Sequence, residues 1–238
     1  MGFLKKFFRN VFRDEVDGNA DSAFEQLTEE QLEAHLSVAR YGDYELTEAV
    51  RPSYDLKVVP RQGYRHDVYR DEDSKSRVPV LMAAVTKEQL FQTFMDLLDP
   101  LGFEVDVVLE TSHHRKSRDH VDLYREHIDL PVLKSVLWEY EDLILNDGCT
   151  GIAVLNPAIP LEVQFDEHKL LIVYGNELGE FERVLCEGEI ERDDEMKFIT
   201  EAEHVHSTSD AFHRQFQELT TRLGMDSVFD TPGREEMV

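Results

Sequence analysis

The sequence contains only two cysteines, Cys149 and Cys186, in 238 residues. They do not form a CxxC pair, and this excludes the common zinc-ribbon and dithiol redox motifs. We therefore expect both thiols to be reduced, as in a cytoplasmic protein. Cys149 lies in the turn sequence of residues 147–151, where a nucleophile with a histidine base would fit. No triad signature accompanies it, so we expect a small buried thiol.

The sequence also lacks a long apolar run. The longest uncharged stretch near the expected core, residues 148–161, contains Asn156, Pro157 and Pro160. It is shorter than the roughly 20 apolar residues that a membrane-spanning helix needs. We therefore expect no transmembrane helix.

Basic residues are scarce, because 25 Lys and Arg stand against 50 Asp and Glu and the net charge is -25. Such a surface repels phosphate backbones, so we expect no nucleic-acid partner. An acidic surface also fits three other roles, namely binding of a basic protein, mimicry of a nucleic acid and adaptation to high salt. The composition leaves these three open.

Motifs for cofactors and catalysis are absent too. Gly148 and Gly151 belong to neither a GxGxxG nor a GxxxxGK phosphate-binding loop. The acidic run at residues 187–195 lacks the ligand spacing of an EF-hand. We therefore expect no cofactor, with zinc or a similar divalent ion as the alternative.

The clearest folding signal runs from residue 151 to residue 206. Leu161, Val163 and Phe165 alternate with polar residues, which predicts a strand with one wet face. Residues 170–174 are apolar on both parities and predict a strand covered on both faces, our candidate for the centre of the sheet. A helix with an apolar face should follow near residues 177–185, and residues 196–206 should form another strand.

Similar patterns extend over the rest of the chain. Periodicity predicts further strands at residues 54–58, 78–85, 103–110 and 152–156. Helices are predicted after capping-box patterns at Thr28 and Thr86 and at residues 131–144 and 209–223. The charged residues 61–77 indicate a surface loop or a hinge. We predict an α+β fold with an antiparallel or mixed sheet and helices mainly on one side.

The same patterns divide the chain into five parts. These are a basic amphipathic helix (1–13), a linker (14–20), a helical segment with a polar loop (21–77), the main α+β domain (78–225) and a loose tail (226–238). Within the main domain, residues 78–85 align with residues 169–176, and each is followed by a helix and a strand pattern. The match favours two similar strand-helix-strand halves, with two unrelated units as the alternative.

The first thirteen residues separate completely into two faces of a helical wheel. The apolar face carries Phe3, Leu4, Phe7, Phe8, Val11 and Phe12. The polar face carries the basic residues Lys5, Lys6, Arg9 and Arg13. This is the composition of a helix that lies on a membrane surface. Docking on the acidic body, docking on a second copy and a disordered tail are the alternatives, and any membrane binding should be weak because a short helix is marginal in water.

The histidines are grouped in the sequence. Seven of the ten fall into two clusters, at His113, His114, His120 and His127 and at His204, His206 and His213. If the two strands that precede them are neighbours, the site would consist of His113, His204 and His206 with Glu110 or Glu203. Imidazoles with a carboxylate suit zinc. The spacing matches no known metal motif, so histidines that only form hydrogen bonds are the favoured interpretation, and a pH-responsive interface is a third.

These observations favour a non-catalytic acidic protein that binds another protein, as an adaptor, a chaperone-like protein or a regulator. A second copy of the chain is one candidate for this partner. The element order after residue 130 is loosely similar to that of secretion-chaperone-like proteins, which implies dimerisation and protein binding. The alternative is a metal-dependent, hydrolase-like enzyme that uses the His/Glu cluster. We expect a cytoplasmic location, with weak contact to the inner membrane face through residues 1–13 as a further hypothesis.

Overall fold

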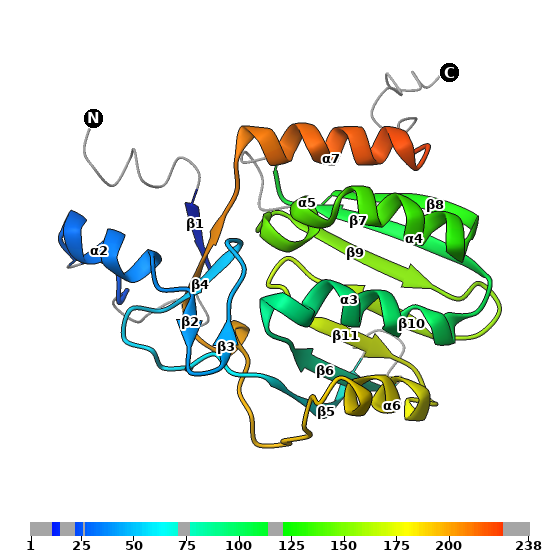
Figure 1. Ribbon diagram of the computed structural model, residues 1–238, viewed down its shortest axis with the longest axis horizontal. Coiled ribbons are helices and arrows are strands. Elements are labelled where there is room, and N and C mark those ends of the chain that lie inside the picture. Colours follow the sequence, from blue (N-terminus) through cyan, green and yellow to red (C-terminus); the bar gives the residue numbers. More distant parts are fainter. Residues whose placement is uncertain (1–10, 15–21, 26, 71–76, 114–120, 226–238) are drawn as a thin grey trace, which may run out of the picture.

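The computed structural model of the chain describes residues 11–14, 22–25, 27–70, 77–113 and 121–225. These residues form a seven-stranded sheet, a three-stranded sheet and a two-stranded ribbon, with helices packed against them (Figure 1). All the paired strands are antiparallel. The prediction of an α+β fold is confirmed.

The large sheet runs through most of the molecule. Its order is β5 (Gly63–Arg70), β6 (Arg77–Ala84), β11 (Leu171–Tyr174), β10 (Glu162–Phe165), β9 (Thr150–Leu155), β7 (Glu104–Thr111) and β8 (Val121–Asp129). The alternating strand β10 occupies the centre. The apolar strand β11 lies beside it, between β6 and β10, so it is interior as predicted but not central.

Helices α3 (Lys87–Leu97), α4 (Leu130–Glu139), α5 (Glu141–Asn146) and α6 (Gly179–Glu187) lie on one face of the large sheet (Figure 1). Helix α7 (Asp210–Arg222) packs beside α5, near the end of the sheet that β7 and β8 form. Phe94 of α3 and Phe165 of β10 meet edge to face, with ring centroids 5.2 Å apart, and both are fully buried. Burial of each such side chain is worth roughly 1.5–3 kcal/mol. Within the described part of the chain, no helix is long and apolar enough to cross a membrane.

A smaller core covers part of the opposite face of the sheet. Alternate residues of β6 face the two cores, since Leu81 packs on the helix side and Val80 packs on the other side. Met196 and Phe198 cover this second face together with Tyr44. The period-two pattern of the strand therefore contributes to both cores.

The three-stranded sheet contains β1 (Val11–Asp14), β12 (His204–Ser207) and β4 (Val50–Pro52), with β12 in the middle. Helix α2 (Glu29–Leu36) packs on it through Leu32, which contacts the cluster around Val205. The capping box of α2 is confirmed, because Thr28 and Gln31 exchange both hydrogen bonds. The ribbon joins β2 (Arg40–Tyr41) to β3 (Tyr44–Glu45), and short 3-10 turns lie at η1 (Asp99–Leu101) and η2 (Ile199–Glu201).

The prediction of a helix over residues 1–13 is wrong for its last three residues. Val11–Asp14 forms strand β1 and pairs with β12, because the open edge of β12 offers backbone partners that a short isolated helix cannot match. Residues 1–10 lie outside the described residues, as do residues 15–21 and the predicted tail at 226–238. The helix prediction for residues 1–10 therefore stays a prediction.

The predicted strand at residues 196–206 is also wrong in part. Met196 and Phe198 are buried, as their alternation predicts, but only His204–Ser207 forms a strand, and that strand belongs to the small sheet. The proposed repeat therefore holds for a strand followed by a helix, in β6–α3 and β11–α6. The third element of the second half has no counterpart in the large sheet.

Other elements differ from the sequence-based prediction at edges and ends. The predicted loop at residues 61–77 contains β5, and the histidine-rich loop before residue 130 contains β8. Both are edge strands with many exposed charged residues, which hides the strand pattern. Residues 54–58 form no strand, since Leu56 adopts a φ of 48°. The helix predicted at residues 131–144 is divided into α4 and α5 at Tyr140.

The helix predicted after Thr86 forms, but its capping box does not. The Thr86 hydroxyl instead accepts the backbone N–H of Glu45 at 2.9 Å, which links α3 to the ribbon. The predicted domain boundary between residues 77 and 78 separates two strands that pair with each other, β5 and β6. The 21–77 segment therefore contributes β5 to the large sheet of the main domain.

Candidate metal centre

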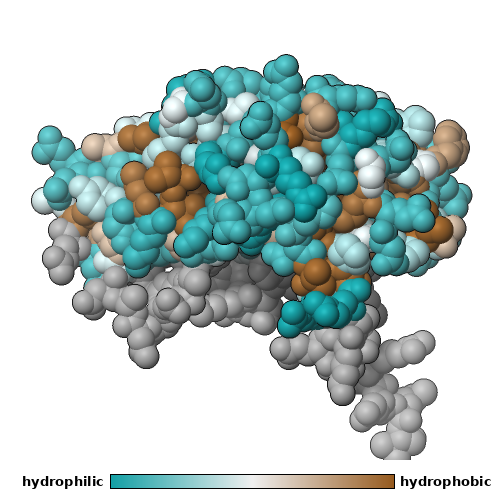
Figure 2. All heavy atoms as spheres, turned by 90° about the horizontal axis from the view of Figure 1, so that it is seen from below, coloured by the Kyte–Doolittle hydropathy of each residue, from teal (hydrophilic) through white to brown (hydrophobic). Residues whose placement is uncertain are grey.

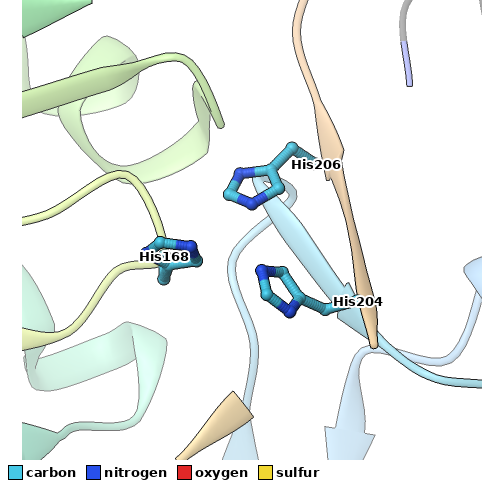
Figure 3. Close-up of side chains that lie close together, drawn as sticks. All are labelled: His168, His204 and His206. Atoms are coloured by element: carbon cyan, nitrogen blue, oxygen red, sulfur yellow. The ribbon is translucent and has the colours of Figure 1, made fainter. Parts of the chain in front are cut away.

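Three histidines from two sheets face one another. His204 and His206 project from the same face of β12, as residues two apart in a strand do, and His168 lies in the turn between β10 and β11 (Figure 3). One ring nitrogen from each lies within 4.8 Å of the other two. The ring centroids form a nearly equilateral triangle with sides of 4.8, 5.0 and 5.1 Å. We call these three residues the histidine triad.

The hydrogen bonds of the triad define which nitrogen carries the proton. His204 Nδ1 lies 2.8 Å from the Ala202 carbonyl oxygen, and His206 Nδ1 lies 2.9 Å from the Gly148 carbonyl oxygen. A carbonyl can only accept, so Nδ1 is the protonated nitrogen of both rings and the lone pair of the neutral ring is on Nε2. Histidine ligands of metal ions commonly have this arrangement.

His168 is held in the same way by a carboxylate. Its Nδ1 lies 2.8 Å from Asp166 Oδ2, two residues earlier in the same turn. Burial opposes the charge of Asp166, but His168, the backbone N–H of Leu170 and Lys169 together outweigh it and bring the pKa of this carboxyl below its usual value. The ionised carboxylate accepts the Nδ1 proton, so the neutral form of His168 also has its lone pair on Nε2.

The triad is largely shielded from water. His204 and His206 are 2% and 0% exposed, and their Nε2 atoms are buried, whereas the His168 side chain retains 19% exposure. A small cavity of about 20 Å³, enough for one water molecule, is lined by His168, Lys169 and Tyr44 among others. The solvent therefore approaches the triad from the side of His168.

Lys169 is a buried cation beside the triad. Its ammonium group donates to the Thr150 carbonyl oxygen at 3.0 Å. Burial lowers the pKa of Lys169 to about 8, against the opposing influence of Asp147, Asp166 and other nearby acidic groups. The surroundings of the triad therefore carry several carboxylates and one buried amine.

The structure brings together only part of the site that the sequence predicts. His204 and His206 do lie side by side, but their partner is His168, which the sequence analysis did not select. The signal that was available is Asp166, which stands two residues before His168 in a turn between two strands. His113 belongs instead to a second group, with Asp147 and Cys149.

The two predicted glutamates have other positions. Glu203 accepts hydrogen bonds from the Ser22 hydroxyl at 2.6 Å and from the Ala23 backbone at 2.9 Å. Glu110 stands opposite Gly151 in the pairing of β7 with β9. Among the described residues, neither glutamate belongs to a group of potential metal ligands. His114 and His120 lie outside the described residues.

The two cysteines have different environments. Cys186 is exposed, and Cys149 is buried, as predicted for a small packed thiol. Burial, with the negative charge of Asp147 nearby, raises the pKa of Cys149 to about 12. The thiol is therefore protonated at neutral pH, and this argues against an activated nucleophile.

Comparison of the chain with protein-family models, with curated proteins and with solved structures returned no significant match.

Proposed function

We propose that this protein binds one divalent metal ion of the zinc type through the histidine triad. The observation that supports this proposal is the convergence of three imidazoles, with one ring nitrogen of each within 4.8 Å of the other two and with each ring oriented by a hydrogen bond at Nδ1. Imidazole nitrogen is a preferred ligand of zinc, copper, nickel and cobalt ions, and zinc is suited to three histidines with one further ligand.

An ion bound at the triad would connect the two main sheets of the protein. His168 belongs to the β10–β11 turn of the large sheet, whereas His204 and His206 belong to the middle strand of the small sheet. An ion held by all three joins the two sheets directly. Since a ligand that binds only the folded state stabilises it, an ion at 100 times its dissociation constant adds about 2.7 kcal/mol to the free energy of unfolding.

Metal analysis of purified protein tests the proposal. Zinc bound per chain is measured on the full chain after removal of metal with a chelator and reloading. His206→Gln and His204→Gln should each bind one equivalent less than the original protein, because glutamine keeps much of the volume and lacks the imidazole ligand. His127→Asn is the matched control, because His127 is exposed on β8 and Asn tolerates its φ of 53°. Equal zinc content in all four proteins would refute the triad.

Hydrolysis is a second candidate function, favoured by the number of ligands. Structural zinc sites usually have four protein ligands, whereas catalytic sites have three and a water molecule whose pKa falls to about 7. The cavity beside His168 has room for that water. Hydrolysis of p-nitrophenyl esters of acetate and phosphate by the zinc-loaded chain should exceed that by His206→Gln. Identical rates would argue for a structural ion alone.

Protein binding, which the sequence favours, stays a prediction. Seen from the side of β5 and α6, the surface is mostly hydrophilic with separate hydrophobic patches (Figure 2). A cleft of about 520 Å³ on the sheet is lined by Tyr69, Val78, Ile159 and Tyr174 among others, and it supports this prediction. Pull-down from native lysate and size-exclusion chromatography test it, and a chain that is monomeric and captures no reproducible partner would contradict it. Liposome flotation with and without residues 1–13 tests membrane contact.

A further inference from the structure

A second group of potential metal ligands lies at the turn to which His206 of the triad is hydrogen-bonded. The turn between α5 and β9 contains Gly148, whose carbonyl accepts from His206, and on either side of it stand Asp147 and Cys149. One ligand atom each from His113, Asp147 and Cys149 lies within 4.8 Å of the other two. We propose that these three residues form a second metal site, which takes a zinc-type ion through nitrogen, oxygen and sulfur.

His113 is positioned for this role. Its Nε2 lies 3.1 Å from Asp147 Oδ2, and its side chain is 3% exposed. Its Nδ1 lies 2.6 Å from the Thr111 hydroxyl oxygen, which orients Nε2 toward the aspartate. The rings of His213 and Phe216 pack against the imidazole at centroid distances of 4.8 and 5.5 Å. A ligand held on both sides in this way needs little reorganisation when the ion binds.

Asp147 is equally fixed. Its carboxylate is fully buried and accepts a hydrogen bond at each oxygen, from Thr150 and from Thr208, both at 2.5 Å. Both oxygens accept a hydroxyl hydrogen bond, so the group is held as a carboxylate. A buried ligand set with that negative charge favours a cation.

Cys149 completes a set that becomes neutral when the ion binds. Coordination replaces the thiol proton, so the S–H bond breaks, a metal–sulfur bond forms and the proton passes to the solvent buffer. The Nε2 proton of neutral His113, which faces Asp147, is lost while Nδ1 gains one through the solvent, and the Thr111 hydroxyl oxygen accepts the new Nδ1–H. No electron is transferred. The thiolate and the Asp147 carboxylate together balance the two positive charges of the ion, which suits a buried position. A simple buried His113–Asp147 ion pair accounts for two of the three residues and gives the thiol no role.

Cobalt substitution tests the second site independently of the triad. The full chain, freed of metal, is titrated with Co²⁺ and its absorption is recorded. We expect two equivalents to bind and a thiolate-to-cobalt charge-transfer band to appear in the near ultraviolet, since only the second site offers sulfur. Cys149→Ser should abolish the band and bind one equivalent, whereas Cys186→Ser, which changes the exposed cysteine, should retain both.

The outcomes of the two proposals are separable. His206→Gln should lose one equivalent and keep the band, and a band without that loss would contradict the triad and support the second site. Absence of the band in the original protein at saturating Co²⁺ would refute the second site, whatever the triad binds. The band is measured on the original protein, so the second site can still be tested if Cys149→Ser does not fold.

Discussion

Gly148→Ala, which adds one methyl group, is a test of how closely the α5–β9 turn packs against His206 of the triad. A Cβ placed on Gly148 would lie 2.6 Å from the Ala49 carbonyl oxygen, 2.9 Å from the Ser207 carbonyl oxygen and 3.0 Å from His206 Cβ. Two of these atoms are backbone, so neither can rotate away. Gly148→Ala must therefore push the α5–β9 turn away from the small sheet.

The magnitude follows from the contacts that this shift disturbs. Overpacking of a close-packed interior costs about 1–3 kcal/mol. The Gly148 N–H donates to Ser207 at 2.8 Å, the Gly148 carbonyl accepts from His206 at 2.9 Å, and each bond is worth about 1 kcal/mol. We expect the free energy of unfolding to fall by about 2–4 kcal/mol, which lowers Tm by about 4–16 °C in a chain of this size. Because the bond to His206 orients a ligand, zinc affinity at the triad should fall about 10–100-fold.

Urea unfolding followed by circular dichroism, with zinc titration by calorimetry, measures both effects. Gly179→Ala is the matched control, because a Cβ at Gly179 meets nothing within 4 Å and the residue begins helix α6. It should leave zinc affinity unchanged and stabilise the fold by up to about 1 kcal/mol. If Gly148→Ala has the stability and the zinc affinity of the original protein, the close approach of the turn to β12 is refuted.

Three further predictions concern other parts of the fold. Ellman's reagent should react with Cys186 in the native protein and with Cys149 only in denaturant, and equal labelling of both would contradict the burial of Cys149. Burial raises the pKa of Glu162, and this favours folding below the unfolded pKa and opposes it above the folded one. Glu162→Gln should therefore raise the free energy of unfolding at pH 7 and leave it unchanged below about pH 4. Phe94→Ala should cost about 3–5 kcal/mol in thermal or urea unfolding, whereas Phe103→Ala, at a side chain 69% exposed, should cost less than about 1 kcal/mol.

Elements whose signal is local were predictable from the sequence. The alternation around Val163 and the capping box at Thr28 lie within a few residues of the structure that they predict, and both are confirmed. Helix α7 (Asp210–Arg222) forms where its periodicity predicts it, and the side chain of the preceding residue, Ser209, accepts the N–H of Phe212. In these elements the amino-acid pattern and the backbone hydrogen bonds involve the same few residues.

Elements that depend on distant partners were not predictable. The edge strands β5 and β8 carry a charged residue or a histidine at about half of their positions, so their hydrogen bonding to β6 and β7 leaves no clear period-two pattern of apolar residues. Strand β12 follows the expected parity, but the sequence does not show that its partners are β1 and β4. The same limitation applies to the site: His204 and His206 form a pair because residues two apart in a strand share a face, whereas their neighbour His168 depends on the tertiary fold.

The acidic composition and the metal proposal have a common electrostatic basis. A chain with a net charge of -25 repels phosphate, and the same excess of carboxylates attracts cations. Around the triad this field is local, since Asp147, Asp166 and Glu167 all act on the buried ammonium of Lys169. The three imidazoles are neutral ligands, so Asp166 and Glu167 compensate the charge of an ion at the triad, whereas the charge of Asp147 is balanced at the second site. Replacing Asp166 by Asn should therefore weaken zinc binding in two ways, by removing a compensating charge and by releasing the Nδ1 hydrogen bond of His168.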